Sequence, residues 1–225
     1  MTSSGPRYTA IADLPPAIPV FPLRHALLLP RAALPLNIFE PRYLVMVEAA
    51  LAGQRIIGMV QPTVPERIAP DDAPPLEAVG CAGRIASFAE QPDGRYLVTL
   101  IGIIRFRVAA ELAVTTPYRQ VRADYADFAG DLVSGNGADA VDRTRLLKTL
   151  ADYLEARNLT TDWDAVAGTD TETLVNALSM MSPFGAREKQ ALIEAGSLGR
   201  RSEVLIALTE RALARSAAGD DSRLQ

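Results

Sequence analysis

The chain offers few side chains that could act as nucleophiles, bases or metal ligands. His25 is the only histidine and Cys81 the only cysteine among the 225 residues. A serine–histidine–aspartate triad could therefore use only His25, and every zinc motif with two histidines is excluded. Cys81 falls within an expected strand, where alternation places Arg84 on the opposite face. We therefore interpret Cys81 as a buried, unreactive thiol.

Three other patterns fail as catalytic or ligand-binding motifs. Ser182 and Lys189 suggest a serine–lysine dyad, but the serine precedes a proline, a pair typical of a helix start. Residues 135–140 resemble a dinucleotide fingerprint without the strand that must precede it. Residues 162–167 begin like a calcium loop but lack the third oxygen ligand and the turn glycine. We predict no catalytic residue, no cofactor and no bound metal.

The charge of the chain points away from nucleic-acid and membrane partners. Asp and Glu outnumber Lys and Arg by 27 to 23, which gives a net charge of −4, whereas nucleic-acid binders usually carry a basic excess. No uninterrupted apolar run approaches the ~18 residues that a membrane helix needs. A single cysteine excludes an internal disulfide and fits a reducing compartment. We expect no nucleic-acid partner, no membrane contact and a cytoplasmic location.

The first half of the chain predicts short strands. The strongest signal is a hairpin over residues 85–108, in which a Pro-Asp-Gly turn at 92–94 joins two apolar runs. Gly102 interrupts the second run and is expected to mark a bulge or bend. Pro41 and Gly53 delimit one helix among the strands. Further strands, of which the proline-rich ones are edge or irregular strands, are expected at 18–23, 27–39, 55–60 and 118–125.

The second half of the chain predicts helices. Leucines recur at helical spacing over residues 146–154, and a capping-box sequence at 169–172 precedes another apolar helical pattern. Ser182 is expected to start the next helix, which ends at Gly196, and a last helix is expected over residues 198–214. Short connections between such helices imply antiparallel packing in a small bundle.

These patterns together predict an α+β fold, with an N-terminal β-rich pseudo-barrel that holds one embedded helix, followed by a C-terminal helical bundle. The expected boundaries are a barrel-like part at 15–128, a linker at 129–137, a bundle at 138–215, and flexible ends at 1–14 and 216–225.

Apolar residues crowd the segment in which prolines block regular strand pairing. A small barrel with irregular edges cannot bury all of them, so the remainder is expected to form a shallow apolar groove. The crowded residues are Leu27, Leu28, Leu29, Leu34, Leu36, Ile38 and Phe39.

The order of several segments resembles the amino-terminal domain of Lon proteases, over about nine tenths of the chain. The segments are Ile18-Pro19-Val20-Phe21-Pro22-Leu23-Arg24, Leu29–Leu36, Phe39–Tyr43, Glu48–Ala52, Ile56–Val60, Val79–Ile85, Leu100–Phe106 and Lys189–Glu194. The resemblance implies a PUA-like barrel followed by a helical bundle, and a role in substrate or partner recognition during proteolysis. Full Lon proteases add an ATPase module and a Ser-Lys protease module, and neither motif occurs in this sequence. The chain is therefore expected to be a stand-alone member without catalytic residues.

The leading hypothesis is a non-catalytic module that binds unfolded or extended protein segments. An exposed strand edge would pair with the segment while the apolar groove receives its side chains. The expected peptide-binding residues are Phe39, Arg42, Tyr43, Met46 and Met59. A separate ATP-dependent protease is a possible partner of such a module.

Two alternatives from other classes stay open. One is a small enzyme whose site no motif describes, with Glu40, Arg42, His25 and Cys81 as its components. The other is a structural protein in which the helical bundle forms a homo-oligomer.

Overall fold

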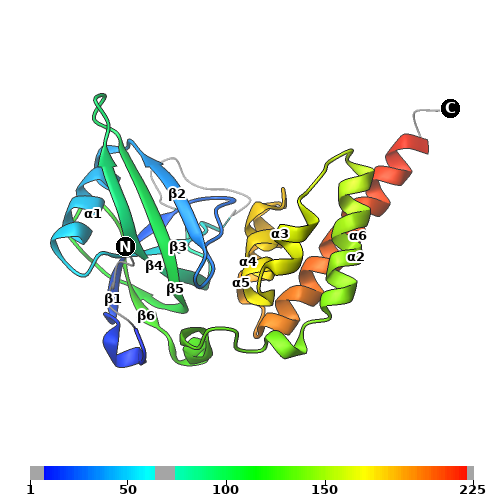
Figure 1. The fold of residues 1–225 in the computed structure, drawn as a ribbon. Helices are drawn as coiled ribbons and strands as arrows, with labels where there is room; N and C mark the ends of the chain where they lie inside the picture. Colours follow the sequence, from blue (N-terminus) through cyan, green and yellow to red (C-terminus); the bar gives the residue numbers. More distant parts are fainter. Residues whose placement is uncertain (1–7, 64–73, 222–225) are drawn as a thin grey trace.

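The computed structural model describes residues 8–63 and 74–221, which form two parts that lie side by side (Figure 1). One part, here called the barrel, contains six strands and one helix, and the other, here called the bundle, contains five helices of the described chain. The strands are β1 (Ala17–Pro22), β2 (Ala33–Ile38), β3 (Ile56–Val60), β4 (Val79–Glu90), β5 (Tyr96–Glu111) and β6 (Gln120–Asp124).

The six strands form one sheet in the order β2-β5-β4-β3-β1-β6, and a further pairing of β5 with β6 closes it. β1 and β3 run parallel, whereas the other pairs are antiparallel. The long β5 takes part in both ends of the closure, because its first half pairs with β2 and its second half with β6. The α+β class, with a β-rich barrel before a helical bundle, is confirmed.

The predicted hairpin forms the longest strand pair of this barrel. Its two strands, β4 and β5, pair from Val79 opposite Arg107 to Glu90 opposite Tyr96, and the loop between them projects beyond the barrel (Figure 1). The pairing shifts register at Gly102, so the predicted bulge is confirmed. A Cβ at Gly102 would lie 2.0 Å from the carbonyl oxygen of Leu29, which explains why this position needs glycine.

The helix predicted between Pro41 and Gly53 is α1 (Pro41–Ala52), and it covers the barrel on the side away from the bundle (Figure 1). Proline occupies its first turn and Gly53 caps its end, as expected. The helix buries Tyr43, Met46, Val47 and Ala50. The Tyr43 ring packs on Phe21 of β1, with ring centroids 4.3 Å apart.

The bundle is formed by α2 (Arg143–Ala156), α3 (Trp163–Gly168), α4 (Thr171–Met181), α5 (Ala186–Glu194) and α6 (Leu198–Asp221). Aspartates cap three of these helices: Asp142 accepts from the backbone N–H of Arg145, Asp162 from that of Ala165, and Asp170 from that of Thr173. The capped start of α4 agrees with the predicted capping-box segment. The last helix is longer than expected.

The expected start of the fifth helix at Ser182 is wrong. Ser182 instead ends α4, where its hydroxyl donates to the carbonyl oxygen of Leu178 at 2.7 Å. The helix α5 begins at Ala186 after Gly185. Pro183 disfavours helical backbone at the residue before it, so α4 ends at Ser182, which has extended dihedral angles. The backbone is still extended at Gly185, so the next helix starts only after that residue.

The chain passes from barrel to bundle through two short 3-10 helices, η2 (Ala126–Leu132) and η3 (Ala138–Ala140). The end of η2 covers the first four positions of the segment expected to be a linker, 129–137, and η3 begins directly after that segment. A third, η1 (Ile11–Asp13), precedes β1, and Leu14 beside it is buried in the core. The remainder of the expected flexible ends, residues 1–7 and 222–225, lies outside the described residues.

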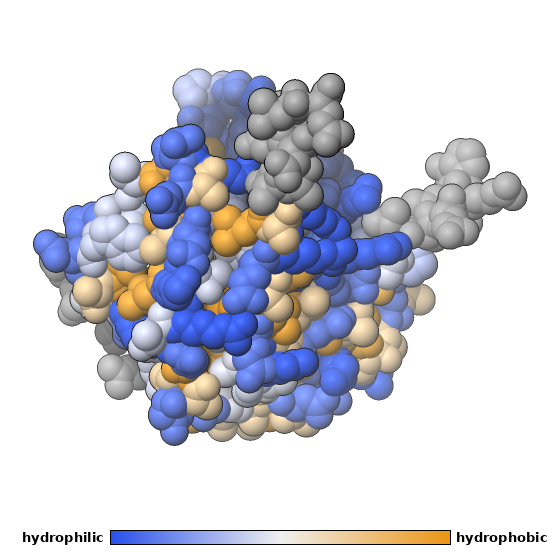
Figure 2. All heavy atoms as spheres, turned by 90° about the vertical axis from the view of Figure 1, so that its right-hand side faces the viewer, coloured by the Kyte–Doolittle hydropathy of each residue, from blue (hydrophilic) through white to orange (hydrophobic). Residues whose placement is uncertain are grey.

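None of the helices within residues 8–63 and 74–221 combines the length and the apolar character needed to cross a bilayer. On the outer side of the bundle, hydrophilic side chains separate the hydrophobic residues from one another (Figure 2).

Candidate functional site

The five residues expected to bind a peptide do not share one exposed groove. Met46 and Met59 are fully buried in the barrel core, and Tyr43 is buried between α1 and β1. A partner cannot reach these three side chains while the barrel is closed. The expectation that they line an exposed peptide-binding groove is therefore corrected: they belong to the core. The physical reason is that α1 turns this face toward the sheet, and that Met59 lies on β3 between two neighbouring strands.

Phe39 and Arg42 are exposed. Phe39 directly follows β2 and is 63% exposed, among the largest exposures of an apolar side chain in the described residues. The Arg42 guanidinium donates to Glu40 at 2.8 Å and lies 4.6 Å from the centre of the Tyr43 ring. These two residues therefore belong to the surface where β2 passes into α1.

The structure does not assemble the components of the alternative enzyme site. Cys81 has no exposed surface, and burial raises the pKa of its thiol far above its ordinary value. His25 is exposed at a turn with a φ of 63°, where its backbone N–H donates to Gln61. Glu40 is engaged by Arg42. An exposed imidazole and a wholly buried thiol cannot act on one substrate atom.

The serine–lysine pair is also occupied by structural contacts. The Lys189 ammonium donates to the carbonyl oxygen of Met180 at 3.0 Å, and burial lowers the pKa of Lys189. The Ser182 hydroxyl donates to a different carbonyl, that of Leu178. Both side chains thus close the end of α4 rather than forming a dyad.

A surface groove that the sequence analysis did not locate lies across β2, β5 and β4. It encloses about 400 Å³ and is lined by Pro35, Leu36, Asn37, Ser87, Phe88, Ala89, Leu97, Val98 and Thr99. Phe88 and Leu97 are 41% and 45% exposed. The register places Leu97 opposite both Asn37 and Ala89, so Leu97 is at the centre of one row of this groove.

Strand β2 forms an open edge beside this groove. Among the described residues it pairs only with β5, along all six positions from Ala33 to Ile38. Its side chains alternate, since Ala33, Pro35 and Asn37 are exposed while Ile38 is buried. Pro35 is consistent with an edge position, as expected for this proline-rich segment. The groove and the edge together offer apolar contact and backbone hydrogen-bonding groups to an extended segment.

Only part of this surface could be anticipated. Leu36 is one of the crowded apolar residues that the barrel was expected not to bury completely, and it is half-buried. Phe88 and Leu97 lie on the predicted hairpin. The sequence feature that could have identified them is that both are apolar residues close to the turn, where few other elements can cover their side chains.

Comparisons with known proteins place this fold in a family. The family model of the ATP-dependent protease La (LON) substrate-binding domain matches residues 17–211. The chain is 26% identical over 205 residues to Lon protease 2 of Myxococcus xanthus, which covers 88% of this chain and 24% of that protein. It is 32% identical over 113 residues to the Lon protease of Dictyoglomus thermophilum, covering 50% of this chain and 14% of that protein.

Two solved structures share the fold. The Lon N-terminal domain protein from Xanthomonas campestris has a TM-score of 0.59 at 24% identity, over 85% of this chain and 97% of the other. The N-terminal domain of the Mycobacterium avium complex Lon protease has a TM-score of 0.62 at 17% identity, over 86% and 98%.

This chain spans about a quarter, or less, of the curated relatives' length. Since the family model matches nearly all of the two described parts, the chain belongs to the LON substrate-binding domain family.

Proposed function

We propose that the protein is a non-catalytic recognition module that binds extended protein segments along β2 and the groove next to it. The observation that carries the proposal is the open edge of β2 directly beside the groove around Leu97. A segment paired with β2 would gain main-chain hydrogen bonds, while alternate side chains of the segment would enter the groove.

The family membership supports recognition of protein substrates, because the matching model is a substrate-binding domain of an ATP-dependent protease. We propose that a separate ATP-dependent protease of the Lon type receives what this module binds. The binding is weak, on the order of micromolar, because ordering an extended partner offsets much of the contact free energy.

The proposal assigns the two parts different tasks. The barrel part, residues 15–128, carries the binding surface, and the bundle, residues 138–215, is held against it through the segment 129–137. A cytoplasmic location accords with a protease partner that consumes ATP.

A binding titration with matched variants tests the proposal. The ligand is a fluorescent, permanently unfolded (reduced and alkylated) protein, and the readout is its anisotropy. We expect saturable binding that Leu97→Lys weakens about tenfold or more, because a charge then occupies the centre of the groove. Leu159→Lys is the control, since Leu159 is 55% exposed but lies in the bundle.

Absence of saturable binding, or equal loss in both variants, would contradict the proposal. Circular dichroism of each variant verifies that the fold is retained, since both positions are exposed and should tolerate lysine.

A further inference from the structure

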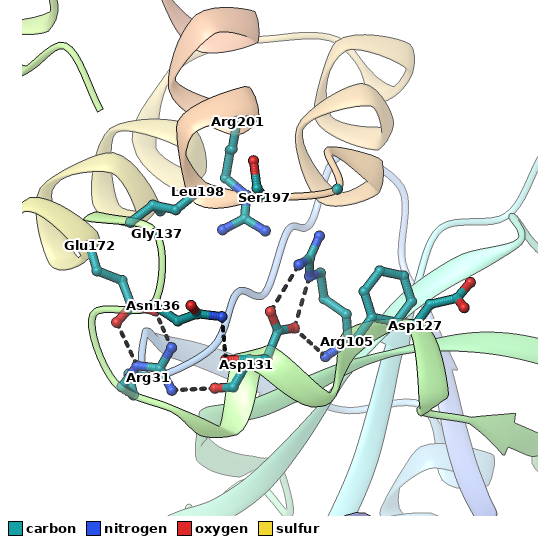
Figure 3. Close-up of a pocket in the computed structure, with 13 residues that line it drawn as sticks. Arg31, Arg105, Asp127, Asp131, Asn136, Gly137, Glu172, Ser197, Leu198 and Arg201 are labelled. Atoms are coloured by element: carbon teal, nitrogen blue, oxygen red, sulfur yellow. Dashed lines mark hydrogen bonds and ion pairs between the residues drawn. The ribbon is translucent and has the colours of Figure 1, made fainter. Parts of the chain in front are cut away.

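A polar cavity of about 110 Å³ lies between the barrel and the bundle (Figure 3). Its walls come from three regions: Arg31 and Arg105 of the barrel, Asp131 and neighbouring residues of the connecting segment, and Glu172 and the start of α6 in the bundle. The groove proposed to bind peptides shares none of these residues. The cavity is therefore a separate site.

Two of the arginines in the cavity wall are neutralised by carboxylates. The Arg105 guanidinium donates to both carboxylate oxygens of Asp131 at 2.8 Å. Arg31 donates to both carboxylate oxygens of Glu172, which also accepts from the backbone N–H of Gly135. The carboxylate of Asp127, at the edge of the cavity, pairs with Arg107.

The third arginine, Arg201 of α6, has no carboxylate partner among the described residues. Its Nε donates to the carbonyl oxygen of Leu192 at 3.0 Å and its Nη1 to the side-chain oxygen of Asn176 at 2.9 Å. Its Nη2 is buried and, within the described chain, has no hydrogen-bond acceptor. The side chain is only 3% exposed and reaches from α6 into the cavity (Figure 3).

This arrangement leaves the Arg201 guanidinium buried without a carboxylate paired directly to it. Burial, followed by the repulsion of Arg105, lowers the pKa of Arg201 to about 10, against the attraction of Asp131 and Glu172. Leaving a buried charged donor without an acceptor is costly, and native structures usually satisfy such groups with an ion or water.

The N-terminus of α6 adds to the positive potential at the same place. Gly196, Ser197 and Leu198, which lead into α6, line the cavity. The first backbone N–H groups of a helix have no acceptor within it, and the helix dipole favours an anion there. A cavity of this volume accommodates one phosphate-sized ion.

We propose that this cavity binds one tetrahedral oxyanion, either free phosphate or the phosphoryl group of a small phosphate ester. One oxygen accepts from Nη2 of Arg201, and others face the start of α6. Access is open, because Asn136, Gly196 and Ser197 at the rim are exposed. Since the walls belong to both parts, a bound anion stabilises the packing of the bundle on the barrel.

A substitution at the helix start tests the site without removing a buried side chain. Ser197 caps α6, as its hydroxyl accepts from the backbone N–H of Arg200. Ser197→Asp keeps this cap and places a carboxylate at the cavity, while Ser197→Asn keeps the cap without a charge. The probes are inorganic phosphate and O-phosphoserine, each compared with chloride at equal ionic strength. The readouts are calorimetric titration and the unfolding temperature.

We expect saturable phosphate binding to the native chain and to Ser197→Asn, and a loss of affinity of about tenfold or more in Ser197→Asp, through repulsion at close range. Binding of O-phosphoserine as well identifies a phosphate ester as the source, and binding of phosphate alone identifies the free ion. A rise in unfolding temperature that is the same in all three chains is a general salt effect. That result, or no saturable binding, would overturn the proposal and leave water as the occupant.

Discussion

Arg105 of the barrel forms a bidentate ion pair with Asp131 of the connecting segment, with both N–O distances at 2.8 Å. The same carboxylate accepts from the backbone N–H of Arg105. The guanidinium also reaches the bundle, where its Nη1 donates to the carbonyl oxygens of Ile193 and Ala195. One buried side chain thus joins all three regions of the molecule.

Asp131→Asn should strongly destabilise the protein. The change leaves Arg105, only 4% exposed, without a counter-charge, and breaking a buried pair in this way typically costs about 3–5 kcal/mol. Urea denaturation gives the free energy of unfolding. The matched control is Glu210→Gln, which removes the partner of Arg145 in an exposed pair and should cost at most about 1 kcal/mol. Equal losses in the two variants would show that the Arg105 pair does not hold the parts together.

Gly102→Ala should destabilise the barrel. The added methyl would meet the carbonyl oxygen of Leu29 at 2.0 Å, so the backbone must shift, and overpacking of this kind costs about 1–3 kcal/mol or more. Gly168→Ala is the control, because an added Cβ there meets nothing within 4 Å. The unfolding temperature should therefore fall in Gly102→Ala but not in Gly168→Ala. An unchanged unfolding temperature in Gly102→Ala would refute the close contact.

Removal of Cys81 should change how stability depends on pH. The buried thiol stays protonated in the folded chain, because burial raises its pKa, whereas the unfolded chain loses this proton above pH of about 9. Stability therefore falls as pH rises past that point, by up to about 1.4 kcal/mol per pH unit for this group. Denaturation of the native chain and of Cys81→Ala between pH 8 and 10 measures the difference. Parallel curves would mean that the thiol ionises equally well in both states.

Asp170→Ala should cost about 1 kcal/mol, since it removes the cap of α4. Asp170→Asn retains an acceptor for the N–H of Thr173 and should cost less. Ser182→Ala should have a smaller effect than Asp170→Ala, because Ser182 is the C-terminal cap residue of α4 and its hydroxyl donates to a carbonyl oxygen rather than satisfying a free backbone N–H. Urea denaturation of the three variants checks this order, and a larger loss of stability in Ser182→Ala than in Asp170→Ala would contradict it.

The elements predicted correctly are those whose signals are local. The β4–β5 hairpin follows from a turn sequence between apolar runs, and α1 from a proline and a glycine at its two ends. Ser182 shows the limit of such signals, because a serine before a proline is found both at helix starts and at helix ends. In this chain the backbone is extended at Ser182 and again at Gly185, which makes Ser182 the end of α4.

The sites depend on contacts that join distant parts of the sequence. Burial of Met46 and Met59 follows from how α1 and the sheet pack, which the sequence does not state. Arg201 lies far along the chain from Arg105 and Asp131, yet all three line one cavity. No local pattern brings such residues together, so the sequence could predict a recognition fold without locating its surface.

Hydrogen exchange at β2 tests the central claim most directly. The backbone N–H groups of residues 33–38 that face outward should exchange more slowly when an unfolded protein segment saturates the native chain, because the segment pairs with this edge. Amides of α2 should not change. Protection confined to the bundle, or no protection at β2 under saturating ligand, would contradict recognition through this strand.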